Sequence, residues 1–263
     1  MFIDSHCHLD RLKLDKYDGE LGLAIEAAQR NGVDKMLCVA IDLENIDKVL
    51  SIAAAYPAVY ASVGVHPGSV DVEEPSLERL VELSKKDHVI AIGETGLDYY
   101  YGKEHRETQL QRFKTHLLAA KQVKKPVIVH TRDAKEETLA YIAQYADPEC
   151  SGVLHCFTED LDMALRAIEH NFYISFSGIV TFKNALELQD VARNIPLERM
   201  LIETDSPYLA PVPYRGKPNE PKYVPDVAKY LAELKNVSVE TLAEVTSRNF
   251  YALFNDAKSE VSY

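Results

Sequence analysis

Two histidines separated by one residue, His6 and His8, stand at the end of the first apolar run of the chain. Side chains alternate between the two faces of an extended backbone, so both rings project from one face, about 7 Å apart along the strand. Imidazole nitrogen is a common metal ligand, and two rings at this spacing suit one ion. A single His-X-His pair also fits two packed or solvent-exposed histidines, so the metal hypothesis depends on the rest of the chain.

Similar polar side chains stand at the ends of later apolar runs. They are His66, Glu94, His130, His155 and Asp205. The other four of the nine histidines lie on predicted helices or before a strand, and we interpret them as solvated surface residues: His88, His105, His116 and His170. This division predicts that the chain gathers imidazoles and carboxylates in one place.

Strand-like runs alternate with amphipathic segments along the chain. We expect strands at residues 2–5, 35–41, 59–65, 89–93, 126–129, 152–154, 172–177 and 200–203. We expect helices near residues 19–31, 43–55, 75–86, 104–123, 133–145, 160–169, 184–193 and 222–234, and a further helix at 238–254 that packs on the barrel or joins a partner. Eight such units predict a single (β/α)₈ TIM-barrel domain over residues 1–263. A doubly wound open sheet is the alternative, but no Gly-X-Gly-X-X-Gly segment follows a predicted strand.

Barrel enzymes carry their catalytic groups at the carboxyl ends of the strands, where these side chains would meet. Four imidazoles and two carboxylates exceed the needs of one tetrahedral ion. They suit a pair of divalent cations bridged by a carboxylate and a water. Glu94 fits the bridging position by its residue type and by its central place in the strand order.

Composition limits the alternatives. A chain of 263 residues with 46% hydrophobic residues can bury a substantial core. It contains no apolar run of about 18 residues, and its first ten residues lack the pattern of a signal peptide, so we expect a soluble, cytoplasmic protein. The net charge of −12 opposes loose adsorption to nucleic acid or anionic membrane, although it does not exclude an enzyme whose bound cations receive phosphate. No obligate protein partner is inferred.

The four cysteines show no Cys-X-X-Cys spacing, and we interpret them as reduced thiols. Cys7 and Cys156 are next to predicted ligands. Strand alternation would turn both thiols to the opposite face, which favours a packing role over metal ligation.

Six stretches carry motifs in order along nearly the whole chain. They are residues 4–10, residues 64–67, Gly93-Glu94-Thr95-Gly96-Leu97-Asp98, His130-Thr131-Arg132, His155-Cys156-Phe157 and Glu203-Thr204-Asp205-Ser206-Pro207. Together they resemble the TatD family of metal-dependent deoxyribonucleases, within the amidohydrolase superfamily. The chain shows no departure from the family pattern at the ligand positions.

The resemblance implies a TIM barrel with two divalent metal ions per chain. His6, His8, Glu94 and Asp205 would hold one ion, and Glu94, His130 and His155 would hold the other. It also implies hydrolysis of phosphodiester bonds in DNA, commonly from the 3′ end of a single strand. Many superfamily relatives use a carboxylated lysine where this family has glutamate, so the bridge formed by Glu94 needs no modification.

Asp205 and Glu94 are the predicted catalytic residues. We expect Asp205 to orient a metal-activated water and take its proton. His66 is expected to hydrogen-bond the scissile phosphate, and Arg132 to make a bidentate phosphate contact. The alternatives are a histidine satisfied within a turn and an ion pair between Arg132 and Asp133.

Glu203 and Asp98 are also placed on the substrate side of the site. Glu203 shares a face with Asp205, and it either supports a ligand histidine or is a buried carboxylate paired elsewhere. Asp98 and the tyrosines at 99–101 would line the substrate groove, although a run of three tyrosines also fits ordinary loop packing.

Residues 206–225 contain six of the twelve prolines, together with Arg215, Lys217 and Lys222. A stiff loop directly after the strand-eight aspartate predicts a wall over the metals whose basic residues face phosphates. The alternative is a rigid surface connection with solvated charges.

Three classes of function remain open at this stage. The first is a metal-dependent 3′-5′ exonuclease on single-stranded DNA. The second is a hydrolase of the same fold that acts on a small ester, an amide or an aminoacyl-tRNA bond, since two metals polarise a carbonyl as well as a phosphoryl group. The third, a metal-dependent scaffold without turnover, is disfavoured by the complete ligand set. Imidazole-rich ligation suits Zn²⁺, and mixed carboxylate ligation also accepts Mn²⁺ or Mg²⁺.

Overall fold

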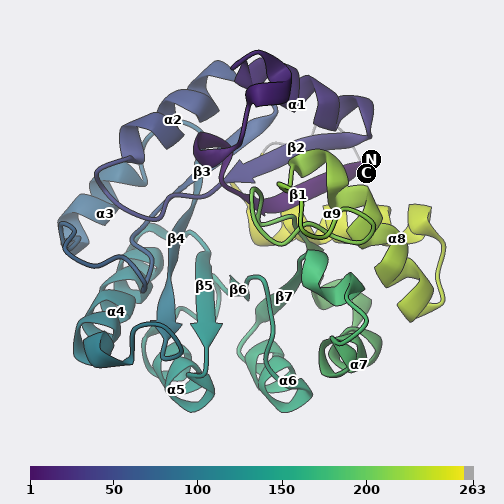
Figure 1. Cartoon of the computed structure of the whole chain (residues 1–263). Helices are drawn as coiled ribbons and strands as arrows, with labels where there is room; N and C mark the ends of the chain where they lie inside the picture. The colour runs from purple at the N-terminus through teal and green to yellow at the C-terminus, as the bar shows by residue number, and fades with distance from the viewer. Residues whose placement is uncertain (258–263) are drawn as a thin grey trace.

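The computed structural model describes residues 1–257, which form a parallel barrel surrounded by helices (Figure 1). Its eight strands are hydrogen-bonded in sequence order. They are β1 Phe2–Cys7, β2 Val33–Cys38, β3 Val59–Val63, β4 Val89–Asp98, β5 Val127–Arg132, β6 Gly152–Leu154, β7 Phe172–Phe176 and β8 Met200–Ile202. The predicted (β/α)₈ TIM-barrel architecture is confirmed.

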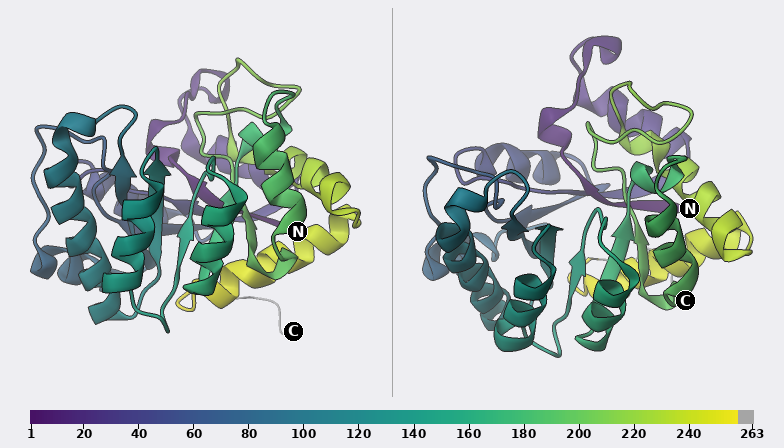
Figure 2. Two further views of the ribbon diagram at one scale, coloured as in Figure 1. Left: turned by 90° about the horizontal axis from the view of Figure 1, so that it is seen from below. Right: turned by 60° about the horizontal axis from the view of Figure 1, so that its bottom comes forward.

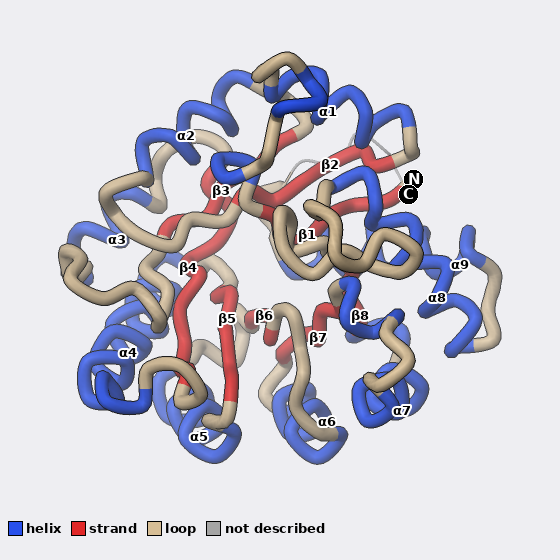
Figure 3. Tube along the Cα trace, viewed as in Figure 1, coloured by secondary structure: helices blue, strands red, loops and turns tan. Residues whose placement is uncertain are grey.

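Helices follow the strands and cover the outside of the barrel, as the tube view shows (Figure 3). They are α1 Leu21–Arg30, α2 Ile46–Ala55, α3 Leu77–Leu83, α4 Arg106–Val123, α5 Lys135–Tyr145, α6 Leu161–Glu169, α7 Leu186–Asn194, α8 Val224–Lys235 and α9 Val239–Leu253. The continuous apolar strands are buried on both faces, which is why they lack the alternation of a half-exposed strand.

Strands β4 and β5 are longer than the sequence pattern predicts. They remain paired up to Asp98 and Arg132, so Glu94 and His130 lie within strands instead of after them. The register shifts between Ile92 and Thr95, and this irregularity contains Glu94. At Gly96, φ is +133° and a Cβ would lie 2.0 Å from the carbonyl oxygen of His130, so only glycine allows the two strands to approach this closely.

The barrel closes between β1 and the segment that follows β8. The N–H of Asp205 donates to the carbonyl of His6 (2.9 Å), and the N–H of His8 donates to the carbonyl of Ser206 (2.8 Å). These bonds also join the candidate ligands at opposite ends of the sequence. Asp4 reinforces the closure, because its buried carboxylate accepts hydrogen bonds from the N–H and hydroxyl of Thr204 (2.9 and 2.5 Å).

Helix α9 lies across the amino-terminal ends of the strands, at the lower edge of the barrel in Figure 2. Its buried Phe250 and Phe254 join an apolar cluster with Tyr60, Ile90 and Ile128 from the barrel interior. The amide of Asn249 donates to the carbonyls of Leu197 and Met200 at the start of β8. Packing on the barrel, one of two outcomes considered for this helix, is confirmed, and the amino-terminal end is closed.

Among residues 1–257, no helix has both the length and the apolar character needed to cross a bilayer.

His116 is fully buried on α4, which contradicts its prediction as a surface residue. Its Nδ1–H donates to the carbonyl of Arg112 (2.8 Å), and its Nε2 accepts from the N–H of Val65 (3.0 Å). The ring therefore joins α4 to the end of β3. His88, His105 and His170 are exposed as predicted.

The burial of His116 predicts an acid-dependent loss of stability. Burial lowers the pKa of its ring from 6.5 to about 4. The unfolded chain takes up this proton at higher pH than the folded chain, so the free energy of unfolding falls as the pH drops between these values, by up to about 3 kcal/mol. We expect His116→Gln to be less stable at neutral pH but to lose less stability on acidification. Urea denaturation over this pH range measures both effects, and an unchanged pH dependence would contradict the assignment.

Candidate metal centre

The six predicted ligands meet at the carboxyl mouth of the barrel. Five of them line a cavity of about 350 Å³, and the sixth, His6, is fully buried beside Glu94. His6 belongs to β1, Glu94 to β4 and His130 to β5. His8 and His155 follow their strands directly, and Asp205 lies three residues beyond the end of β8. The backbone N–H of Glu94 donates to the carbonyl of Ala40 (3.0 Å), which fixes its carboxylate in the middle of this group.

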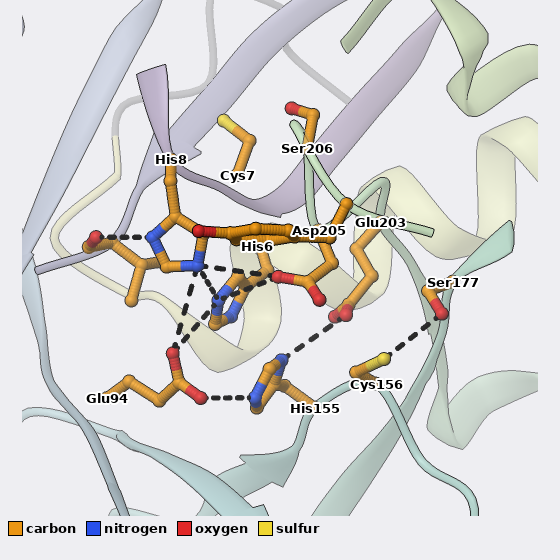
Figure 4. A network of polar contacts seen from close by, with 12 residues as sticks. His6, Cys7, His8, Glu94, His155, Cys156, Ser177, Glu203, Asp205 and Ser206 are labelled. Carbon is orange, nitrogen blue, oxygen red and sulfur yellow. Dashed lines mark hydrogen bonds and ion pairs between the residues drawn. The ribbon is translucent and has the colours of Figure 1, made fainter. Parts of the chain in front are cut away.

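Glu94 presents its two carboxylate oxygens to two different sets of side chains (Figure 4). Its Oε2 lies 3.3 Å from Nε2 of His6 and 4.0 Å from Nε2 of His8. Asp205 completes this side, with Oδ1 at 3.8 and 3.4 Å from the same two nitrogens.

The other oxygen, Oε1, faces three further histidines. It lies 2.7 Å from Nε2 of His155, 3.4 Å from Nδ1 of His130 and 3.3 Å from Nε2 of His66. The carboxylate of Glu94 therefore stands between two groups of nitrogen and oxygen atoms, as a bridging ligand would.

Three of the histidines use their outward ring nitrogen to donate a hydrogen bond. His8 donates from Nδ1 to the carbonyl of Val39 (3.0 Å), His130 from Nε2 to Asp98 (3.1 Å), and His155 from Nδ1 to Glu203 (3.3 Å). In a neutral ring, this leaves the inward nitrogen with a free lone pair. Such an arrangement is typical of metal-binding histidines, because it fixes both the tautomer and the orientation of the ring.

The site favours positive charge near its carboxylates. Burial opposes ionisation of Glu94, but His155, His66 and His6 hold its pKa well below the ordinary value. Burial likewise disfavours a charged His155, yet Glu94 and Glu203 hold its pKa well above that of a free imidazole. The rings of His6 and His155 are stacked with centroids 3.8 Å apart, and burial and the neighbouring His155 lower the pKa of His6. Metal binds ionised carboxylates and neutral imidazoles, so a cation would displace the proton of His155 and take over its positive charge beside Glu94.

The donor atoms fit divalent cations by chemistry and by spacing. A tetrahedral ion with ligand distances of about 2.0–2.2 Å holds its ligand atoms about 3.4 Å apart. On the Oε2 side of Glu94, neighbouring ligand atoms are separated by distances close to this value. Nε2 of His6 lies 3.3 Å from Oε2, and it lies 3.4 Å from Nε2 of His8. The site therefore has the donor set of a metal centre.

Comparison with known protein families agrees with this geometry. The model of a family described as TatD related DNase matches residues 3–255. This chain belongs to the TatD family. Its relatives include two proteins described as uncharacterized metal-dependent hydrolases, YcfH of Escherichia coli K12 and YabD of Bacillus subtilis 168. YcfH is 47% identical over 96% of this chain and 95% of its own length, and YabD is 39% identical over 97% and 99%.

A solved TatD-family structure confirms the fold of the whole chain. The crystal structure of YjjV, a TatD homologue from Escherichia coli K12, matches with a TM-score of 0.89 and 31% identity, covering 97% of this chain and 98% of that one. Family and fold together establish this TatD-family chain as a metal-dependent hydrolase.

Two residues predicted on the substrate side of the TatD-family site instead support histidines. Glu203 is fully buried beside His155, so the substrate role does not fit its position. Asp98 is also buried, and its carboxylate holds His130 while accepting the N–H groups of Tyr100 and Tyr101 (3.0 and 2.9 Å). Support of a histidine was one of the two alternatives considered for Glu203.

His66 and Arg132 do line the cavity. The ring of His66 is 22% exposed and close to Glu94, so it can reach both the site and a bound molecule. The guanidinium of Arg132 lies 4.2 and 4.8 Å from the ring centroids of Tyr100 and Tyr101, whereas the pair with Asp133 is not among the ion pairs of residues 1–257. Both tyrosines are largely exposed, as a groove wall requires.

Cys156 is among the residues that line the cavity, whereas strand alternation placed it on the opposite face. Cys156 has a φ of +41°, so the chain leaves the extended conformation here and strand alternation no longer applies. Its Sγ lies 3.1 Å from the hydroxyl of Ser177, and burial raises the pKa of the thiol well above its ordinary value. Cys7 does point away from the site, toward the carbonyl of Leu37 (3.4 Å).

The sequence patterns placed Tyr208 within the wall expected over the metals at residues 206–225 without giving it a role, and they did not identify the carbonyl of Val39 as part of the site. Tyr208 lines the cavity, with its ring 6.1 Å from that of His8. Its position just beyond the Asp205-Ser206-Pro207 motif was an available signal. A backbone carbonyl has no residue-type signal.

Proposed function

We propose that this protein hydrolyses phosphodiester bonds of DNA, releasing nucleotides from the 3′ end of a single strand with the help of two divalent cations, Zn²⁺, Mn²⁺ or Mg²⁺. The observation that carries the proposal is the position of Glu94, with one carboxylate oxygen toward each group of ligands. Membership of a DNase family supports DNA as the substrate.

Each ion would be held by one group of side chains around Glu94. His6, His8 and Asp205 would share the first ion with Oε2, and His130 and His155 would share the second with Oε1. When bound, the pair would lower the pKa of a water molecule and neutralise charge on the phosphoryl oxygens.

Asp205 is placed to orient the attacking water and accept its proton. Its side chain is 14% exposed at the cavity, whereas that of Glu94 is only 3% exposed. Although burial opposes ionisation, a hydrogen bond from His8 and the charges of nearby histidines lower the pKa of Asp205, so it is a carboxylate near neutral pH. A base must reach the water directly, and Asp205 would do so from the cavity wall.

His66 and Arg132 are placed to bind the phosphate itself. Both donate from the cavity wall, and a guanidinium can donate two parallel hydrogen bonds to one phosphate. The stacking of Arg132 on Tyr100 orders its side chain before the substrate arrives, which reduces the entropy cost of binding.

The closed amino-terminal end leaves the carboxyl mouth as the approach to the site. Helix α9 fills that end with Phe250 and Phe254, so a strand of DNA cannot pass through the barrel. The scissile group enters and leaves by the carboxyl mouth.

The outward hydrogen bonds of the ligand histidines give a prediction about metal affinity. Glu203→Gln and Asp98→Asn are expected to weaken metal binding about 10–100-fold each, because they loosen His155 and His130 respectively. Titration against a chelating dye measures the dissociation constants. Asp147→Asn, which alters a buried carboxylate paired with Lys124 outside the site, is the control. Unchanged affinity in both site variants would contradict the proposed ligand set.

Reconstitution of metal-stripped protein tests the function. Mg²⁺, Mn²⁺ and Zn²⁺ are supplied in turn with 3′-labelled single-stranded DNA, an aminoacyl-tRNA and a small neutral ester. We expect stepwise loss of the 3′ label, with substrate affinity that falls as salt concentration rises. Intact DNA with every ion, together with cleavage of another ester, would overturn the nuclease proposal in favour of the ester or aminoacyl hydrolase. Within that alternative, the net charge of −12 favours a small neutral ester, because an aminoacyl-tRNA is polyanionic like DNA.

A further inference from the structure

A groove of about 430 Å³ lies beside the metal centre, and three cations line it. Lys13 comes from the loop after β1, and Arg215 and Lys217 come from the loop after β8. We call this surface the basic groove. Within the described residues 1–257, no carboxylate lines it, although acidic residues outnumber basic ones by 41 to 29 in the whole chain.

The three cations of the basic groove are available to a ligand. All three side chains are exposed, and none takes part in an ion pair within residues 1–257. Arg215 is also ordered, because its guanidinium lies 4.3 Å from the ring centroid of Phe182, which lines the same groove. An acidic protein that leaves three neighbouring cations unneutralised offers a local site for anions.

A buried carboxylate holds the two sides of the groove together. Glu220, near the end of the β8 loop, pairs with Lys16 and Lys222 and accepts from the hydroxyl of Tyr17. Because Lys16 and Tyr17 follow Lys13 closely in the chain, this cluster brings Lys13 beside the β8 loop. Burial, followed by the charges of Lys222 and Lys217, lowers the pKa of Lys16, which indicates how closely the cations are packed.

The basic groove is continuous with the cavity of the metal centre. Tyr208 and Leu209 line both of them, and the ring of Tyr208 is half exposed. A molecule with one end at Glu94 would pass Tyr208 and reach Arg215 and Lys217.

We propose that the basic groove binds the sugar-phosphate backbone of the single strand that adjoins the scissile bond. This inference rests on the proposed function and adds that the substrate is a polymer held over more than one phosphate. Repeated phosphates match the repeated cations, and Tyr208 offers a face on which an unpaired base stacks. The groove has the volume of a site for one small molecule, which suits a flexible single strand instead of a duplex.

The test compares two variants that each lose two positive charges. Lys13→Ala with Lys217→Ala alters the basic groove. Lys85→Ala with Lys86→Ala alters an exposed basic surface at the opposite end of the barrel, before β4. Fluorescence anisotropy of the Mn²⁺-loaded full chain, with labelled 12-nucleotide oligo-dT carrying phosphorothioate linkages, gives the dissociation constant over a range of salt concentrations.

The groove variant is expected to bind oligo-dT roughly tenfold more weakly than the wild type. Its plot of log affinity against log salt should be shallower by about 1.4, since each phosphate contact to a single strand contributes about 0.7. The loss should be greater for the 12-mer than for a dinucleotide, and oligo-rU should behave as oligo-dT does. The control variant should bind as the wild type does.

Two results would overturn the inference. One is equal binding by the groove and control variants. The other is displacement of oligo-dT by polyglutamate of equal charge, which would indicate a general anion surface. Binding through the groove without hydrolysis in the presence of any metal would instead overturn the proposed function. If the variant without Lys13 and Lys217 hydrolyses DNA as well as the wild type does, only the proposed role of the basic groove would be overturned.

Discussion

Glu94→Gln is expected to lose at least one of the two metal ions and to lower kcat roughly 10³-fold or more. Glutamine keeps the shape of the side chain and one carbonyl oxygen, but its amide nitrogen is not a metal ligand. The substitution also removes the negative charge that both ligand groups face at Oε1 and Oε2. Elemental analysis of the reconstituted protein gives the metal content, and steady-state hydrolysis gives kcat.

Loss of the fold would not explain this result. The new amide can donate a hydrogen bond to the inward nitrogen of His155, which lies 2.7 Å from Oε1 in the wild type, so the metal-free variant should still fold. It should unfold at a lower temperature than the metal-free wild type, because the negative charge that the neighbouring histidines stabilise is gone. Asp147→Asn is the matched control for removing a buried carboxylate. Two bound ions and a wild-type rate in Glu94→Gln would refute the bridging role.

Asp205→Asn is expected to lower kcat about 10²–10⁴-fold, because a neutral amide cannot accept the proton of the attacking water. The effect on the two ions should be unequal. Among the ligand histidines in residues 1–257, Asp205 has nitrogens within 4.0 Å only at His6 and His8, so an ion held by His130 and His155 should keep its affinity. The variant should therefore show a larger change in kcat at saturating metal than in the metal dissociation constant of that second ion.

Single-turnover measurements separate the two contributions of Asp205. If the variant loses activity only because a metal is lost, excess metal should restore the rate. If Asp205 is the base, the rate should remain low with both ions bound. Full turnover with both ions bound would refute the assignment.

The sequence predicted the position of the candidate site because the carboxyl end of each strand can be recognised from a short stretch of residues. Continuous apolar runs identified all eight strands, and the barrel topology then placed His6, Glu94 and Asp205 at one mouth despite their distance in the chain. The division of ligands around Glu94 came only from the family resemblance, since spacing along a chain does not determine which oxygen faces which ring.

The wrong predictions concern the periodicity of side-chain positions. Strand alternation was applied to a residue outside the extended strand, and helical spacing was overlooked within a helix. Strand alternation does not extend to Cys156, whose backbone has a positive φ. Helical spacing did hold for α4, where His116 shares the buried stripe of Phe113, Leu117 and Ala120. Treating every polar residue on a helix as solvated overlooked that stripe.

The supports of the ligand histidines were harder to predict, because they depend on three-dimensional register. Asp98 reaches His130 only because β4 and β5 stay paired beyond Glu94, with Gly96 permitting the close approach. The length of that pairing depends on contacts between two strands and is not visible in either one.

Helix α9 closes the amino-terminal end of the barrel, and this affects how a product can leave the site. Under the proposed function, a nucleotide freed at Glu94 would have no rear exit and would leave through the opening that admits the next DNA end. Free product and incoming substrate would then exclude each other from one passage. We therefore expect mononucleotides to inhibit competitively.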